Sequence, residues 1–332
     1  MQHYYIDRCS GEVRRERLLG DGLVGILYSR VREQSPKLFR ALTSPRASAW
    51  LAHLNYDSLL GARLAGASRF LRSLGVDPEE LREPLEALDT PRKVFERRIR
   101  YEDCRPLAGE REVASPADAR VLVGSLRKAS ALFLKEKFFS FEELLGETKT
   151  RWLTAFRGGD YAVFRLTPEK YHYNHVPAAG RVVDHYEIEG AHHSCNPSAV
   201  VSLVTPFSKN RRVITVLDTD TQGGERVGLV AMIEVAALMI GEIVQCYSPQ
   251  DYDHPQPIMP GMLLAKGQPK SLFRPGSSTV VLLFQPGRVG FSEDLLANQL
   301  RPGVTSRFSA GFGRPLVETE VLVRSAVARS LA

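Results

Sequence analysis

The sequence predicts an α+β fold, in which an N-terminal helical segment precedes a mainly antiparallel β core. Two observations support this prediction. Apolar residues recur at helical spacing between residue 16 and about residue 100. From about residue 110 onward, short apolar and β-branched runs alternate with turn residues instead. Such spacing is typical of antiparallel, sandwich-like sheets with few helices.

The helical segment is predicted from an apolar stripe that begins at Leu18, ends at Val31 and is interrupted by glycines. A second set of apolar residues begins at Trp50 and continues to Leu74. The ordinary interpretation is packing against the rest of the protein. The alternative is an amphipathic anchor, because basic, leucine-rich helices can lie in a membrane interface. We therefore divide the chain into an N-terminal helical, membrane-associating region (1–105) and a β-rich domain (106–332).

Seven apolar runs with intervening turns are interpreted as strands. They are Val121–Val123, Ala162–Phe164, Val182–Val183, Val200–Val204, Val213–Leu217, Leu229–Val235 and Val280–Phe284. One short helix is predicted at Ser140–Gly146. The longest apolar stretch, 227–244, contains two glutamates and is interpreted as buried strands rather than a membrane span.

Composition indicates an ordinary soluble globular protein. The chain has 332 residues, of which 43% are apolar and 25% charged, so the core needs neither disulfides nor metals. Its four cysteines lack CxxC spacing, which argues against a zinc site and for a reducing compartment. No signal peptide is expected from the N-terminal residues.

The net charge of +6 would suit nucleic acid, anionic lipid or an acidic substrate. Five arginines cluster between Arg92 and Arg105. The chain carries no zinc finger, RNA-binding strand motif or basic heptad region, so we expect no nucleic-acid partner.

One short run near the C-terminus carries the main chemical signal. Gly276, Ser277, Ser278 and Thr279 directly precede the predicted strand at Val280–Phe284. A serine held at a strand start can attack the carbonyl of its own preceding peptide bond. That reaction builds a pyruvoyl group out of the chain itself. Taken alone, the run is more simply explained as a turn.

Two further segments carry residues suited to this chemistry. Asp118 follows a Ser-Pro-Ala turn, and the segment 171–180 contains His172 and His175. Histidines three residues apart can bind a metal on a helix, but Pro177 argues against a helix and no third ligand is evident, so we expect no metal. An aspartate, a histidine and a serine instead match the orienting group, base and nucleophile of a triad.

Together these segments resemble the phosphatidylserine decarboxylase family, whose members depend on a pyruvoyl group. The family signatures are a Ser-Pro-x-Asp-Gly turn, a Tyr-His-x-x-His-x-Pro segment and a Gly-Ser-Thr or Gly-Gly-Ser-Thr site before a strand. The matching segments here are 115–118, 171–180 and 277–279, and the resemblance covers nearly the whole chain. The chain departs from the pattern at Ala119 and Ser277, where the family has glycine.

The resemblance implies a self-cleaving catalytic domain at 106–332. His175, oriented by Asp118, would deprotonate Ser278, which attacks the carbonyl of Ser277. The products are a β subunit (1–277) and an α subunit (278–332) that begins with pyruvoyl. Ser277 is the alternative precursor, with cleavage between 276 and 277. We favour Ser278 because strand register places its side chain.

The implied activity is conversion of phosphatidylserine to phosphatidylethanolamine. The pyruvoyl ketone would form a Schiff base with the substrate amine and act as electron sink. By the same resemblance, His172 would assist decarboxylation. The expected partners are phosphatidylserine, an anionic membrane surface and the two subunits of the heterodimer, with the protein peripheral on the cytoplasmic face of the cell membrane.

Three alternatives remain open at this point. The first is a pyruvoyl decarboxylase of another, soluble amino acid. The second is a lipid-binding homologue that never processes, which the departures at Ala119 and Ser277 favour. The third is a metal-dependent hydrolase built on His172 and His175 or on His192 and His193.

Overall fold

The computed structural model describes residues 2–18, 20–52, 56, 75–127, 138–203, 205–238, 242–276 and 278–332. Its strands are β1 (Tyr4–Asp7), β2 (Val13–Arg15), β3 (Glu112–Ala114), β4 (Ala119–Ser125), β5 (Asp160–Leu166), β6 (Tyr173–His175), β7 (Gly180–Ile188), β8 (Arg212–Asp218), β9 (Leu229–Val235), β10 (Ile243–Gln245), β11 (Leu263–Leu264), β12 (Pro269–Phe273), β13 (Ser278–Phe284), β14 (Val289–Phe291), β15 (Thr319–Val321) and β16 (Ala326–Ser330).

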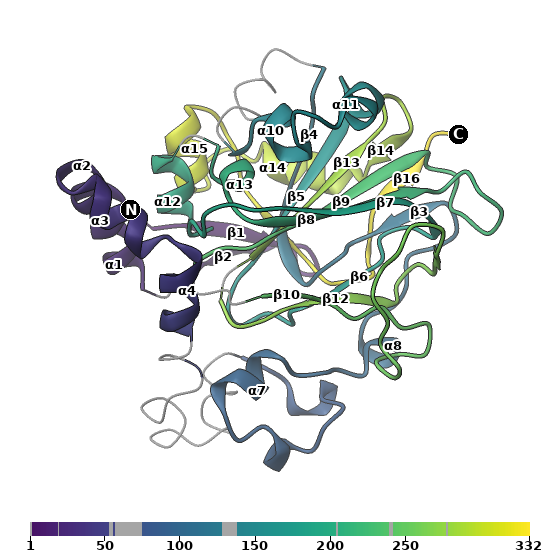
Figure 1. The fold of residues 1–332 in the computed structure, drawn as a ribbon, viewed down its shortest axis with the longest axis horizontal. Coiled ribbons are helices and arrows are strands. Elements are labelled where there is room, and N and C mark those ends of the chain that lie inside the picture. Colours follow the sequence, from purple (N-terminus) through teal and green to yellow (C-terminus); the bar gives the residue numbers. More distant parts are fainter. Residues whose placement is uncertain are drawn as a thin grey trace.

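A large twisted sheet forms the centre of the molecule, with the strand order β11-β7-β8-β9-β13-β5-β4-β15-β1-β2 (Figure 1). Its pairs are antiparallel except β1 with β15, which is parallel. Two three-stranded antiparallel sheets accompany it, β10-β12-β6 and β14-β16-β3. The α+β class is therefore confirmed.

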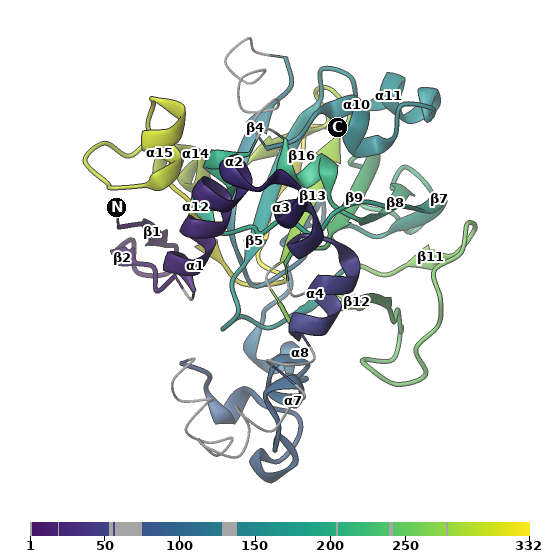
Figure 2. The same ribbon diagram turned by 60° about the vertical axis from the view of Figure 1, so that its left-hand side comes forward.

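The helices of the N-terminal part form one group outside the sheets, at the left of Figure 1 and in front of the large sheet in Figure 2. They are α1 (Asp21–Ile26), the π-helix at Leu27–Val31, α2 (Arg32–Gln34), α3 (Pro36–Leu42) and α4 (Pro45–Ala52). Among the described residues, no helix has the length and apolar character needed to cross a bilayer.

The remaining helices are short and lie in the connections between strands. They are 3-10 turns at Pro78–Glu80 and Leu85–Ala87, and α7 (Pro91–Phe95), α8 (Tyr101–Cys104), α10 (Phe141–Leu145), α11 (Thr150–Phe156), α12 (Pro197–Ser202), α13 (Pro206–Lys209), α14 (Glu293–Gln299) and α15 (Arg307–Phe312).

The N-terminal region is less uniformly helical than the sequence predicts. The first strands, β1 and β2, join the large sheet through β15, so the boundary at residue 105 does not separate a helical region from the β core. Side-chain burial explains this, because Tyr5 and Ile6 are part of the core. Continuous helical structure begins at Asp21, and 78–104 contains only short turns of helix. Most of the predicted second stripe, 53–55 and 57–74, lies outside the described residues.

Six of the seven predicted strand runs lie in β4, β5, β7, β8, β9 and β13, and the predicted helix at Ser140–Gly146 is α10. The prediction of a strand at 200–204 is wrong, because 197–202 form α12. The two residues at the start of this segment favour a helix. Asn196 caps the backbone N–H of Ser198 with its side chain, and Pro197 occupies the first turn, where its missing N–H costs nothing.

Strand β13 has the most constrained position in the sheet. It pairs along its length with β5 on one edge and β9 on the other, and all seven of its residues are buried. Ser278 is its first residue and pairs with Leu166, the last residue of β5. The ladders therefore fix the start of β13 at the edge of the hydrophobic core.

A buried ionic cluster connects the two ends of the chain to the centre of the sheet. Arg165 on β5 donates to the carboxylates of Glu16 and Glu318 over 2.5–2.9 Å, and Arg120 on β4 also contacts Glu16. His3 lies 3.0 Å from Glu318. All five side chains are buried, so each charge depends on its partners for solvation.

Candidate active site

The predicted site residues lie where two strands leave the large sheet and enter the small one. At one end Ser278 pairs with Leu166, and at the other the N–H of Phe273 donates to the carbonyl of His172 over 3.1 Å. The connections from β5 to β6 and from β12 to β13 therefore meet at both of their ends. Ser278 lies at one end of this corner and His172 at the other.

The hydroxyl of Ser278 is buried and has no hydrogen-bond partner among the described residues. The same is true of the neighbouring hydroxyl of Thr279. Buried polar groups are rarely left unpaired, and each such group needs an explanation. A serine hydroxyl without a competing hydrogen bond suits a nucleophile. Ser277, the predicted acyl side of the scissile bond, lies outside the described residues.

His172 lies against Phe95 of α7, with ring centroids 3.6 Å apart. The imidazole is fully buried, and neither ring nitrogen makes a hydrogen bond of normal geometry in the described chain. Burial, followed by the positive charge of Arg97, lowers the pKa of His172 well below its usual range, although the backbone of Lys170 favours the protonated form. The ring is therefore neutral and offers one nitrogen that can accept a proton.

His175 is held by two hydrogen bonds. Its Nδ1 lies 2.7 Å from the carbonyl oxygen of Gly267, and its Nε2 lies 2.9 Å from the hydroxyl of Tyr171. Burial lowers the pKa of His175 to about 3, so the ring is neutral. Because a carbonyl oxygen can only accept, Nδ1 carries the hydrogen and Nε2 is the basic atom.

Gly267 needs to be glycine for this contact. Its φ of +75° is strained for other residues, and a Cβ at this position would lie 2.4 Å from a methyl carbon of Leu107. The carbonyl that orients His175 therefore comes from a backbone conformation available to few residues. Sequence reasoning did not identify Gly267, although a glycine just after the Leu263–Leu264 strand was a visible turn signal.

Asp118 does not orient His175 through a hydrogen bond, which corrects the predicted arrangement. Its carboxylate accepts hydrogen bonds from Arg105, the shortest being 2.9 Å, and from the N–H of Val323 over 2.7 Å. Burial opposes ionisation, but the charge and hydrogen bonds of Arg105 outweigh it and lower the pKa of Asp118.

The two residues are nevertheless neighbours. The N–H of His175 donates to the carbonyl of Pro116 over 2.8 Å, two residues before Asp118. The negative charge of Asp118 also favours the protonated form of His175.

The arginine cluster at 92–105 is divided between the interior and the surface, since Arg100 is exposed and Arg92 and Arg98 are half-buried. Arg97 and Arg105 are buried, and Arg105 bridges Asp118 and Glu80. Arg98 pairs with Glu83. These partners could not be inferred from sequence, because they lie far along the chain or on separate loops.

A buried ion pair lies under the site and was not predicted. The ammonium of Lys270 on β12 lies 2.9 Å from the carboxylate of Glu234 on β9, and both side chains are fully buried. Ser271 also donates to Glu234, and Asn174 donates to Ser271 over 3.0 Å. The pair thus connects the large sheet to β6, the strand that carries His175.

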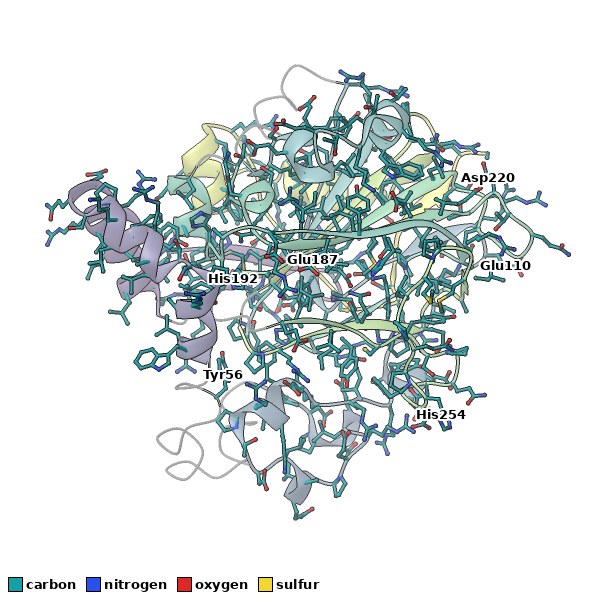
Figure 3. The ribbon with its side chains drawn as sticks, in the orientation of Figure 1. Tyr56, Glu110, Glu187, His192, Asp220 and His254 are labelled. Atoms are coloured by element: carbon teal, nitrogen blue, oxygen red, sulfur yellow. The ribbon has the colours of Figure 1, made fainter. Side chains whose placement is uncertain are left out.

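A cavity of about 170 Å³ adjoins the corner. Its wall includes Leu166, the strand partner of Ser278, and Tyr56. Tyr56 lies between α4 and α7 in Figure 3, and its ring is 5.8 Å from that of Phe95, which stacks on His172. The cavity wall therefore includes the strand partner of Ser278, and Tyr56 and Phe95 separate the cavity from His172.

The second pair of histidines lies beside the N-terminal helices. Figure 3 shows His192 in this position, and its side chain is buried. The ring of His193 stacks on Phe39 of α3 with centroids 5.8 Å apart. Burial lowers the pKa of His193 to about 4. Ring stacking on Phe39 therefore accounts for the buried position of His193.

A family model described as phosphatidylserine decarboxylase matches residues 92–311, which include all four predicted site residues. The chain belongs to the phosphatidylserine decarboxylase family. A phosphatidylserine decarboxylase proenzyme from Chlamydia pneumoniae is 34% identical over 245 residues, covering 73% of this chain and 74% of its own length.

Two other bacterial proteins with the same description cover more of the chain. The one from Chlamydia trachomatis serovar L2 is 31% identical over 296 residues, with 88% of this chain and 90% of its own length covered. The one from Fusobacterium nucleatum is 24% identical over 295 residues, with 89% and 91% covered. The similarity therefore extends well beyond the residues that the family model matches.

The lowered pKa of His175 predicts that acid destabilises the folded chain. Between pH 7 and 5 the unfolded chain takes up a proton at His175 and the folded chain does not, since the pKa of His175 is about 3 in the folded chain and 6.5 for a free histidine side chain. This group alone should lower the free energy of unfolding by about 2 kcal/mol. Urea titrations of the Ser278→Ala chain at both pH values measure the loss.

The same titrations with His175→Gln added should show a correspondingly smaller loss. His254→Gln, at an exposed histidine labelled in Figure 3, is the matched control and should leave the parent's loss unchanged. An unchanged pH dependence in the His175 variant would contradict the assignment.

Proposed function

We propose that this chain decarboxylates phosphatidylserine to phosphatidylethanolamine, using a pyruvoyl group that it makes from Ser278. The observation that carries the proposal is the buried Ser278 hydroxyl, which has no partner among the described residues, at the start of the central strand of a chain whose His172 and His175 are also buried. Family membership and the description of the relatives as proenzymes support it.

In the proposed processing reaction, Nε2 of His175 removes the hydroxyl proton of Ser278. The oxygen then attacks the carbonyl carbon of residue 277, and the peptide bond is replaced by an ester. Elimination leaves a carboxylate on residue 277 and dehydroalanine at 278, and hydrolysis of the latter releases ammonia and leaves the pyruvoyl group.

The hydrogen bonds of His175 indicate what this reaction requires. Gly267 fixes the proton on Nδ1, so Nε2 is the correct atom to act as base. In the uncut chain the hydroxyl of Tyr171 is hydrogen-bonded to Nε2 of His175. This nitrogen can therefore act as base only after that hydrogen bond is replaced by one to Ser278. Asp118 would then stabilise the charged imidazole through its negative charge rather than by a direct hydrogen bond.

When formed, the pyruvoyl group supplies an electron sink for decarboxylation. His172 is proposed to move the proton that this reaction requires. It has a ring nitrogen that can accept a proton, is neutral because of burial, and is separated from the cavity by Phe95 and Tyr56. The surrounding apolar rings exclude water from this proton transfer.

We further propose that the two fragments remain together as a heterodimer. Residues 278–332 contribute β13 between β9 and β5, and β15 between β4 and β1. They also contribute β14 and β16 to the sheet that contains β3. The small fragment could leave only if two of the sheets were dismantled.

Peripheral attachment to the cytoplasmic face of the cell membrane is proposed from the surface of the N-terminal helices. Leu23 is 77% exposed and Trp50 is 63% exposed, which is unusual for large apolar side chains. The exposed apolar residues of this group are Leu23, Ile26, Leu38 and Trp50. Exposed basic residues on the same helices are Arg30, Lys37, Arg40 and Arg46. Apolar and basic side chains together suit an anionic bilayer surface.

This surface favours a lipid substrate over a soluble amino acid, which would need no membrane contact. The alternative of a lipid-binding homologue that is never cleaved can be tested by direct measurement. Purified protein incubated with phosphatidylserine should form phosphatidylethanolamine and carbon dioxide. Mass spectrometry should find a fragment of about 55 residues that begins with pyruvoyl at 278. A preparation that decarboxylates the lipid while staying uncut would exclude the proposed mechanism, and a fragment longer by one serine would move the precursor to 277.

The two histidines should give different phenotypes. His175→Ala should remain full length, because loss of a general base typically slows a reaction about a hundredfold or more. His172→Ala should cleave but decarboxylate poorly. A denaturing gel measures the first effect, and product formation by the cleaved fraction measures the second. The opposite pattern would show that the roles are exchanged.

Membrane binding should have a salt-sensitive and a salt-resistant part. Each basic residue near an anionic surface contributes about 1 kcal/mol, screened within roughly 10 Å at moderate salt, whereas apolar insertion is not screened. Leu23→Ser with Ile26→Ser should remove the salt-resistant part, measured by sedimentation with phosphatidylglycerol vesicles. Leu27 is left intact, because it packs with Tyr28 and Phe39 in the interior.

Leu300→Ser is the control, at an exposed leucine after α14, and should bind as the parent does. Equal sedimentation of the double variant and the parent in high salt would place the membrane contact elsewhere.

A further inference from the structure

Two neighbouring cavities lie between the hairpin formed by β1 and β2, α1 and α12, and they share part of their lining. The inner one is the cavity of about 170 Å³ beside the candidate site. The outer one, of about 650 Å³, is more polar, and both are lined by Glu16, Arg17 and Leu18. The full lining of the outer cavity is Gln2, His3, Arg15, Glu16, Arg17, Leu18, Asp21 and Arg307. A molecule entering the inner cavity from the outer one passes Arg17.

The charges along this path are unbalanced. The exposed guanidinium groups of Arg15 and Arg17 make no hydrogen bond or ion pair with any described residue. The nearby carboxylates are already used, since Glu16 is held by Arg165 and Arg120, and Asp21 is bound by Arg307. The path therefore presents guanidinium groups with no compensating anion from the protein.

We propose that Arg17 binds the phosphodiester of the lipid headgroup at the junction of the two cavities. This inference rests on the proposed function and names a binding residue for its substrate. Guanidinium is well suited to the task, because its planar donors match two oxygens of a phosphate at once. Arg15, which lines only the outer cavity, would add positive charge at the entrance.

The order of groups along the path matches the order within a serine phospholipid. The wall of the inner cavity includes Leu166, the strand partner of Ser278, toward which the serine amine would have to point. A short linker separates that amine from the phosphate, which would then lie nearer the entrance, at Arg17. Helix α1 begins between the cavities and exposes Leu23 and Ile26, so the acyl chains would continue toward its apolar surface.

Arg14 provides a matched control. It lies on the same strand as Arg15 and carries the same charge, but it lines neither cavity. Its guanidinium is already paired with Asp7 over 2.7 Å and with Glu12 over 3.4 Å. A change at Arg14 alters the charge of the surface and leaves the path intact.

Isothermal titration calorimetry of the full purified protein tests the proposal without requiring turnover. The probes are glycerophosphoserine, free serine and inorganic phosphate. Glycerophosphoserine should bind the parent and Arg14→Gln equally and bind Arg17→Gln at least about tenfold more weakly, equivalent to about 1.4 kcal/mol. Arg17→Lys, which keeps the charge and loses the planar fork, should be intermediate. Any binding of serine should not depend on Arg17.

Each contrary result overturns the proposal. Equal binding of glycerophosphoserine to Arg17→Gln and the parent excludes Arg17 as the phosphate ligand. Equal loss in Arg14→Gln shows a general surface-charge effect. Inorganic phosphate binding as tightly as glycerophosphoserine shows a free-phosphate site rather than a headgroup site. Decarboxylation by the parent protein is measured separately and tests the proposed function. Failure of the proposal for Arg17 can therefore be distinguished from failure of the proposed function.

Discussion

The position of β13 in the middle of the large sheet is the constraint on which the rest of the site depends. The ladder with β5 includes every residue of the strand, beginning with Ser278, and the ladder with β9 begins one residue later at Thr279. A nucleophile that attacks its own chain has to be aligned closely with the neighbouring carbonyl. Here the backbone is held by β5 at Ser278 and by both neighbours from Thr279 onward, and no described residue binds the Ser278 hydroxyl.

Buried charges hold the surroundings of this strand together. Arg165, Arg105 and Lys270 each bind carboxylates in the interior, so part of the basic composition is internal. Removing one partner of a buried ion pair is much more costly than exchanging both for apolar groups, so these pairs specify which segments meet. Through Arg165, they bring the N-terminal residue Glu16 and the C-terminal residue Glu318 to the same point.

The sequence predicted the features that depend on local pattern. Six strand runs, the capped helix after Ser140 and a strand beginning at the serine run all follow from alternation and turn residues. Features that depend on distant segments were missed. The parallel pairing of β1 with β15 joins the two ends of the chain, and the binding of Asp118 by Arg105 depends on how a separate loop packs. The apolar stripe at 18–31 was visible in the sequence, but only the structure shows which of its side chains are packed and which are exposed.

Because strands of residues 278–332 lie between strands of residues 1–277, the chain has to fold before it is cleaved. Strands β13 and β15 each lie between strands of residues 1–277. The sheet can therefore assemble in a unimolecular reaction only while the bond before Ser278 is intact. After cleavage, reassembly would need two separate molecules to meet, and its rate would fall on dilution. A cut protein of this design persists because it unfolds slowly, and molecules that do unfold are not readily recovered.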